Sequence, residues 1–98
     1  MNNDFKTYQE AADMLKALAH PVRLCIVCGL LGKEQCNVSY MQECLDLPQS
    51  TVSQHLQKLR SLGIVTAERN GLEVNYRIAN DKVAKLVRGL FEEETADE

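Results

Sequence analysis

Seven residues between positions 49 and 58 could form hydrogen bonds with a polar partner: Gln49, Ser50, Thr51, Ser53, Gln54, His55 and Lys58. Glutamine, serine and threonine side chains can read the edges of DNA bases, and lysine neutralises backbone phosphates. From Leu47 through Ala67 the chain contains no Asp or Glu, so no negative charge in this segment would repel a polyanion. The alternative interpretation is an ordinary solvated helix face, because polar helix faces are common.

Four cysteines form a second group with chemical capacity. Cys25 and Cys28 lie three residues apart, and Cys36 follows a short polar segment. Thiolates bind soft ions such as arsenite or cadmium, and thiols can pass through a disulfide or a persulfide. A soft-metal cluster of Cys25, Cys28 and Cys36 is therefore one hypothesis. The plain alternative is core packing, which we also expect for Cys44, because free cysteine is among the most buried residue types.

Length and composition indicate one small globular domain over residues 1–98. The chain is 45% hydrophobic and 26% charged, with a formal net charge of -3. Much of the acidic charge lies in residues 80–98, away from the polar segment. The start of the chain has no basic region followed by an apolar one, and no run approaches the roughly 18 apolar residues of a membrane span. We therefore expect a cytoplasmic protein with reduced thiols and no membrane association.

The polar segment is predicted to form a helix over about residues 48–62. Pro48 suits a first helical turn, and the apolar residues that follow at helical spacing are Val52, Leu56 and Leu59. A shorter helix is predicted to end at about Leu45, so that only Asp46–Pro48 separates the two. Two helices joined by so tight a turn are typical of a helix-turn-helix.

A β-hairpin is predicted over about residues 64–78. Residues 64–69 and 72–78 favour strands, and Asn70-Gly71 between them is the dipeptide preferred in a type I′ turn. A helix-turn-helix followed directly by a hairpin is a winged helix, whose wing can reach DNA phosphates. Arg69 at the tip would make that contact.

Three further helices complete the predicted fold, which is mainly α with a β-hairpin. They span about residues 4–19, 21–31 and 80–94, and Asn80 could cap the last one. The first and last helices carry broad apolar stripes that need a partner, which a second protomer could supply. The middle helix is apolar almost all round and is predicted to be the buried centre.

The chain resembles the ArsR/SmtB family of small winged-helix repressors over nearly its whole length. The resemblance is carried by residues 15–24, which include His-Pro-Val-Arg-Leu, by residues 47–60, which include Gln-Ser-Thr-Val-Ser-Gln-His-Leu, and by residues 62–65 and 71–78. It implies a homodimer that packs through the helices 4–19 and 80–94 and presents two recognition helices to a palindromic operator in double-stranded DNA. It also implies a repressor that an inducer releases from DNA.

The family's metal sites are incomplete in this sequence. Where metal sensors carry Cys-Val-Cys, this chain has Cys36-Asn37-Val38, and the pattern of the last helix reads Asp81, Val83, Glu94 and Asp97, without histidine. We therefore expect no metal site and no cofactor. By its position, Cys28 resembles a reactive cysteine of the family's thiol sensors, although their second cysteine is missing here. Our preferred hypothesis is therefore that the protein senses oxidation or persulfidation at Cys28, and the second is that it senses a soft metal. The alternative to both is that no small-molecule inducer acts on it.

Two other classes of protein fit the sequence less well. An enzyme is disfavoured because Cys25 and Cys28 lie inside an apolar helix, whereas thiol-disulfide exchange needs such a pair at a helix start beside a sheet. A protein-binding adaptor would expose apolar side chains on residues 49–60, where this chain has polar ones. His20, before Pro21, lacks partners at ligand spacing and is interpreted as structural.

Overall fold

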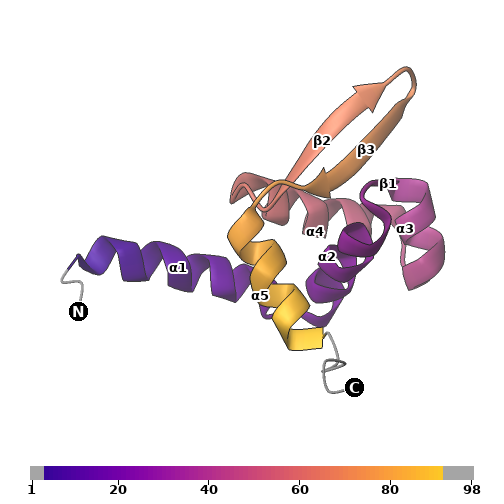
Figure 1. Ribbon diagram of the computed structural model, residues 1–98. Helices are drawn as coiled ribbons and strands as arrows, with labels where there is room; N and C mark the ends of the chain where they lie inside the picture. Colours follow the sequence, from indigo (N-terminus) through magenta and orange to yellow (C-terminus); the bar gives the residue numbers. More distant parts are fainter. Residues whose placement is uncertain (1–3, 92–98) are drawn as a thin grey trace, which may run out of the picture.

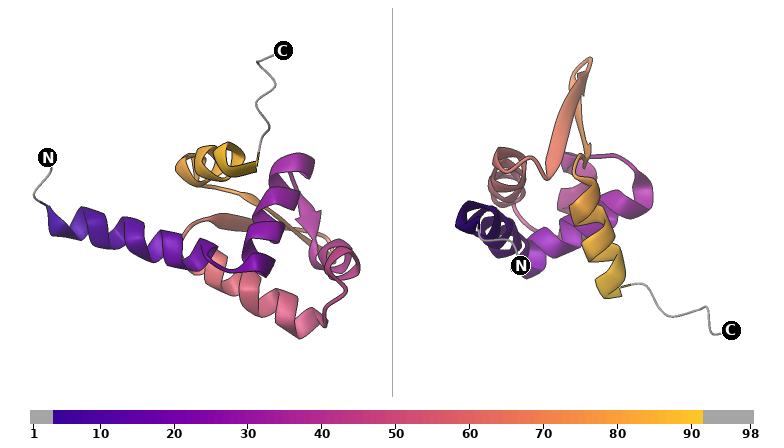
Figure 2. Two further views of the ribbon diagram at one scale, coloured as in Figure 1. Left: turned by 90° about the horizontal axis from the view of Figure 1, so that it is seen from below. Right: turned by 60° about the vertical axis from the view of Figure 1, so that its left-hand side comes forward.

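The computed structural model describes residues 4–91, which form a winged helix-turn-helix (Figure 1). The elements in order are α1 (Phe5–Leu18), α2 (Pro21–Lys33), β1 (Cys36–Asn37), α3 (Val38–Leu45), α4 (Gln49–Ser61), β2 (Val65–Asn70), β3 (Glu73–Ile78) and α5 (Asp81–Phe91). Two parts project from the body: α1 on one side and the β2–β3 hairpin, which we call the wing, on another (Figures 1 and 2). The predicted fold class is confirmed.

The core lies where α2, α4, α5 and the base of the wing meet. Its fully buried large side chains are Val27, Leu30, Val52, Leu56, Leu59, Ile64, Val65, Val83 and Val87. Helices α2, α4 and α5 and the first residue of β2 contribute to this set, together with Ile64 just before β2. The expectation that α2 contributes to the buried centre agrees with its buried residues Ile26, Val27 and Leu30. Among the residues of α1, only Ala17 and Leu18 are buried.

The helix-turn-helix depends on backbone geometry at two helix ends. Asp46 closes α3 in the left-handed region (φ 56°), a conformation that aspartate tolerates better than most residues. Gly63 closes α4 with φ 75°, where the Gly63 and Ile64 N–H groups donate to the Arg60 and Leu59 carbonyls. This is a Schellman ending, and it lies where the predicted helix over about residues 48–62 was expected to stop.

The sheet differs from the predicted two-stranded hairpin. It has three strands in the order β1-β3-β2, because Cys36 pairs with Tyr76 and Asn37 with Asn75. The hairpin register pairs Asn70 with Glu73, so Gly71 and Leu72 form the turn rather than Asn70 and Gly71. Gly71 has φ 71° and Leu72 does not have a positive φ, which fits a type II′ turn, whereas type I′ needs two positive values.

Helix boundaries agree closely with the predicted ones. Helix α2 runs two residues further than expected, to Lys33. Asn80 caps α5 as predicted, accepting a hydrogen bond from the Val83 N–H at 3.1 Å. The expected end of α5 near Glu94 lies outside the described residues. Over residues 4–91 no single helix has the length and hydropathy of a membrane span, and α1 and α2 meet that test only as a pair bent by 92°.

Leu59 tests the packing of α4 against the core. Its side chain is fully buried, so Leu59→Ala should lower the free energy of unfolding by about 2–5 kcal/mol, through lost burial and the cavity left behind. Leu72→Ala provides the matched control, because Leu72 is fully exposed in the wing turn and its truncation should change stability by less than about 0.5 kcal/mol. Equal effects in urea denaturation would contradict this account.

Candidate nucleic-acid interface

Helix α4 presents a polar face to solvent and an apolar face to the core. Val52, Leu56 and Leu59 are buried, and the exposed side chains are Gln49, Ser50, Ser53, Gln54, Gln57, Lys58, Arg60 and Ser61. Five residues of the predicted DNA-binding set therefore lie together on this face. Gln57 and Arg60 belong to the same surface but were not in the predicted set, although helical spacing from Ser53 and Gln54 could have placed them there.

The first turn of α4 is open to a ligand. Pro48 is its N-cap and provides no side-chain hydrogen bond to the backbone. The Thr51 and Val52 N–H groups reach the Pro48 carbonyl, at 3.1 and 3.2 Å. Because a helix N-terminus attracts anions, this end of α4 suits the approach of a phosphate.

His55 faces inward, which differs from its predicted place among the DNA contacts. Its Nδ1 accepts a hydrogen bond from Arg23 Nε at 3.2 Å, and its ring lies 4.5 Å from that of His20. Arg23 also donates to the Ala17 carbonyl at 3.2 Å, which ties the end of α1, the start of α2 and α4 together. Thr51, also in the predicted set, is half-buried. His20 is structural, as expected, because its Nδ1 accepts from the Val22 N–H as the N-cap of α2.

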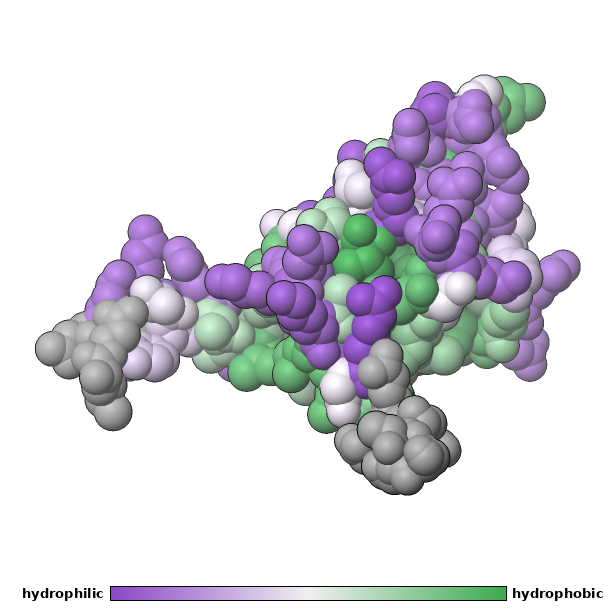
Figure 3. Space-filling model, in the orientation of Figure 1, coloured by the Kyte–Doolittle hydropathy of each residue, from purple (hydrophilic) through white to green (hydrophobic). Residues whose placement is uncertain are grey.

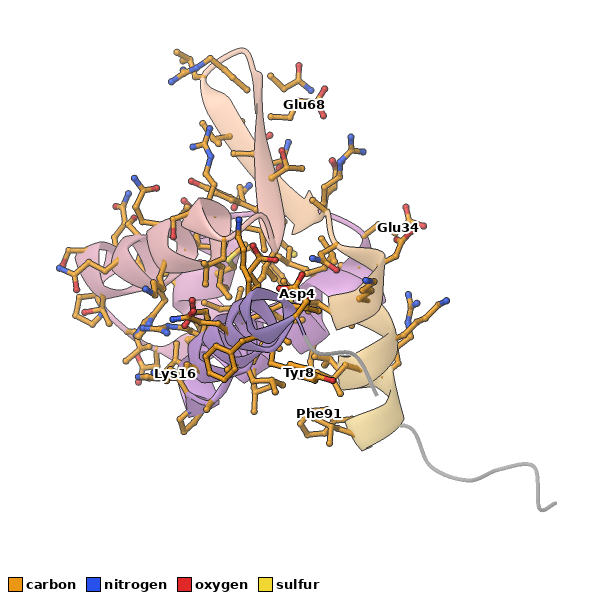
Figure 4. All side chains as sticks on the ribbon, turned by 90° about the vertical axis from the view of Figure 1, so that its left-hand side faces the viewer. Asp4, Tyr8, Lys16, Glu34, Glu68 and Phe91 are labelled. Carbon is orange, nitrogen blue, oxygen red and sulfur yellow. The ribbon has the colours of Figure 1, made fainter. Side chains whose placement is uncertain are left out.

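The wing borders the same surface as the start of α4. A shallow groove between them is lined by Gln49, by Asn37–Ser39 of the α3 start and by Leu72–Val74 of the wing. Arg69 is exposed near the tip, on the strand face that also carries Ala67. The face of the wing seen in Figure 3 is mostly hydrophilic, with a hydrophobic tip, and Leu72 of the turn is fully exposed. Glu68 also projects from the wing, so its charge is mixed (Figure 4).

Cys28 lies apart from Cys36, whereas Cys25, Cys36 and Cys44 line one cavity, which corrects the predicted cluster of Cys25, Cys28 and Cys36. Cys28 lies beside Cys25 on α2, whereas Cys36 on β1 lies near Cys44 on α3. Over residues 4–91 no group of three His, Cys, Asp or Glu side chains could hold a metal ion. The soft-metal hypothesis therefore loses its geometric basis. Cys44 is exposed, contrary to the expected core position.

The thiol hypothesis at Cys28 stays a prediction. The side chain is half-buried, and burial raises the pKa of its thiol, with a further rise caused by Cys25. A raised pKa lowers the thiolate fraction at neutral pH and with it the reactivity. The family's metal-site pattern on the last helix falls on Asp81, Val83, Glu94 and Asp97. Asp81 is exposed and Val83 is in the core, while Glu94 and Asp97 lie outside the described residues.

Comparison with known proteins finds similarity to helix-turn-helix transcriptional repressors. A family model described as a helix-turn-helix domain matches residues 18–68. The transcriptional repressor PagR of Bacillus anthracis is 41% identical over 85 residues, 87% of this chain and 85% of PagR. Its crystal structure matches with a TM-score of 0.81 at 41% identity, covering 89% of this chain and 99% of that one.

Two mycobacterial proteins extend the comparison. The repressor SmtB of Mycobacterium tuberculosis is 46% identical over 77 residues, which are 79% of this chain and 56% of SmtB. A homodimeric winged helix-turn-helix DNA-binding domain of a possible ArsR-family regulator from Mycobacterium bovis matches with a TM-score of 0.79 at 32% identity, over 92% of this chain and 82% of that one.

The fold and the polar helix thus define a winged helix-turn-helix protein. More narrowly, the chain belongs to the ArsR/SmtB family of transcriptional repressors.

The contact between His55 and Arg23 makes stability depend on pH. Arginine stays protonated, so His55 Nδ1 can accept its hydrogen bond only when the ring is neutral. Burial lowers the pKa of His55, and His20 and Arg23 lower it further. The unfolded chain therefore binds this proton more readily. The resulting stability is complete above the ordinary histidine pKa of about 6.5 and is lost as the pH falls through the lowered folded value.

His55→Gln keeps a hydrogen-bond acceptor at this position but removes the titration. We expect its free energy of unfolding to fall less steeply than that of the wild type between about pH 7.5 and pH 5.5. Urea denaturation at several pH values measures both slopes. Parallel slopes would show that His55 does not cause the pH dependence.

Proposed function

We propose that this chain is a cytoplasmic, sequence-specific DNA-binding repressor and not an enzyme. The observation that carries the proposal is the α4 face, where the exposed side chains are hydrogen-bonding or basic and none is acidic. In this assignment Gln49, Ser50, Ser53 and Gln54 contact base edges or nearby phosphates, whereas Lys58 contacts the DNA backbone. Arg69 of the wing reaches an adjacent phosphate. Helix α4 is then the recognition helix.

The acting unit in this proposal is a homodimer on a palindromic operator. Large apolar side chains remain exposed on the two helices that flank the core: Phe5, Tyr8 and Leu15 on α1, and Leu86, Leu90 and Phe91 on α5. Tyr8 projects from α1, and Phe91 projects from the end of α5 (Figure 4). A second copy that covers this surface would bring two recognition helices to two half-sites. The mycobacterial homodimer of the same fold supports this arrangement.

Gln54 and Lys58 should have different effects on DNA binding. Gln54→Ala is expected to cost about 1–3 kcal/mol on a specific operator and little on unrelated DNA, because it removes a base contact. Lys58→Ala should weaken binding to all sequences similarly and flatten the salt dependence, because it removes a phosphate contact. Gel-shift titrations on the DNA upstream of the encoding gene, and on a scrambled duplex, measure both effects.

A double variant gives the decisive control for the recognition helix. Ser53→Ala with Gln54→Ala changes only exposed side chains and should leave the fold intact, as circular dichroism would verify. If this folded variant keeps full operator affinity, α4 is not the reading element.

Leu90 tests the proposed dimer. The side chain is 62% exposed on α5, so Leu90→Lys should not disturb the protomer but would bury a charge in the subunit contact. We expect a monomer in analytical ultracentrifugation. Leu72→Lys, which changes an even more exposed leucine outside α1 and α5, should remain a dimer. A Leu90→Lys protein that stays dimeric would place the subunit contact elsewhere.

A further inference from the structure

A cavity of about 150 Å³ lies between α2 and α3, away from the polar face of α4. Its floor consists of buried side chains from three elements, namely Ile26 and Leu30 of α2, Cys36 of β1 and Met41 of α3. Exposed residues form its rim: Cys25, Gly29, Lys33, Tyr40 and Cys44. A cavity of this size with an apolar lining holds a single benzene-sized ring.

The lining favours an aromatic ring over a saturated one. Four of the ten lining residues carry sulfur: Cys25, Cys36, Met41 and Cys44. Sulfur atoms form favourable contacts with aromatic rings, because they are polarisable and approach the positive ring edge. Gly29 leaves one wall open, since a side chain added there would meet nothing within 4 Å.

The rim carries one charge, which is positive. Lys33 is the single charged residue in the lining, and no Asp or Glu lines the cavity. Its Nζ lies 4.7 Å from the centroid of the Tyr40 ring, which holds the ammonium at the mouth. A ligand with an acidic group beside its ring would place that group at Lys33 and the ring on the sulfur-rich floor.

The cavity touches the elements that hold the DNA-binding surface in place. One wall is α3, which leads into α4 through the short turn at Asp46. The floor includes Cys36, whose strand β1 pairs with β3 of the wing at Tyr76. A molecule between α2 and α3 therefore acts on the spacing between the core helix and both DNA-contacting parts.

We propose that this cavity binds a small monocyclic aromatic acid and that the bound acid weakens operator binding. The regulatory half of this inference rests on the function proposed above, whereas the binding half does not. By linkage, the operator must weaken ligand binding by the same factor by which the ligand weakens operator binding.

The binding half is tested on the DNA-free protein with benzoate as the probe. Amide resonances of a ¹⁵N-labelled sample should shift saturably on α2, β1 and α3, with a Kd on the order of 1 mM or tighter, within the limit for so small a ligand. Benzylamine, which has the same ring and the opposite charge, should bind at least fivefold more weakly. Lys33→Gln should remove that preference. The absence of saturable shifts, or equal affinity for both probes, would overturn the inference.

Two glycines of α2 provide a matched pair of variants. Gly29→Leu fills the cavity from its open wall and should abolish benzoate binding, whereas Gly32→Leu, on the same helix but outside the lining, should not. A Cβ added at either glycine meets nothing within 4 Å, and leucine is a stronger helix former than glycine, so both variants should fold. Undiminished benzoate binding by Gly29→Leu would place the site elsewhere.

The regulatory half is tested by operator titrations with and without saturating benzoate. The wild type and Gly32→Leu should lose at least threefold in operator affinity, and the affinity of Gly29→Leu should not respond. Sodium chloride at the same ionic strength is the control, because DNA affinity depends on salt. Unchanged affinity of benzoate-bound wild type would refute the regulatory half. A protein that binds benzoate but no operator would refute the proposed function and leave the site in place.

Discussion

The packing of Val52, Leu56 and Leu59 against the core determines how α4 is oriented. Fully burying such a side chain contributes about 1.5–3 kcal/mol, so turning these three residues out to solvent would cost several times that amount. Rotating α4 about its axis would expose them and bury glutamine and lysine. The polar face is therefore directed outward by hydrophobic energy, and the hydrogen bond between Arg23 and His55 adds one polar contact on the inner side of the helix. Binding specificity and stability are assigned to opposite faces of one helix, so exposed positions such as Gln54 can vary without loss of the fold.

The buried face of α4 also explains why His55 differs from its polar neighbours. His55 lies between the exposed and buried faces, where it meets Arg23 and His20 at the junction of α1, α2 and α4. A neutral ring accepts the hydrogen bond of Arg23, and protonation of His55 would place its positive charge beside the Arg23 guanidinium. At acid pH the junction is therefore destabilised by charge repulsion, which an apolar residue in place of His55 would not cause. The position of α1 relative to α4 depends in part on this contact, because Arg23 also binds the Ala17 carbonyl.

The sequence predicted the elements with local patterns better than those formed by distant contacts. Helical spacing, the turn at Asp46–Pro48 and Gly63 specify α3, the turn and α4, because each depends on neighbouring residues alone. Strand β1 was missed because two residues cannot show a period, and their pairing with Tyr76 and Asn75 is visible only in the folded chain. The hairpin turn moved by one residue because the register of the strands, not the favoured Asn-Gly dipeptide, placed it.

The candidate site was predictable to the same extent. Helical spacing identified most of the exposed face of α4, but it could not show that His55 turns toward Arg23, which is 32 residues away. The cysteines show most clearly that sequence spacing does not predict contacts between distant residues. Sequence proximity grouped Cys25, Cys28 and Cys36, whereas folding brings Cys36 beside Cys44 and leaves Cys28 on another side of α2.

Helix α3 is the part of the helix-turn-helix that the core holds least firmly. Met41 is its one buried residue, whereas α4 has three, and the cavity occupies the space where α3 would otherwise pack on α2. Regions with few buried apolar contacts move at low free-energy cost. Motion of α3 would reach the start of α4 through the turn at Asp46 and the wing through β1. A winged helix whose reading helix is firmly packed but whose neighbouring helix is loosely packed can change its DNA affinity without unfolding its core. The incomplete packing between α2 and α3 would therefore let a ligand bound there shift α3 without disturbing the buried face of α4.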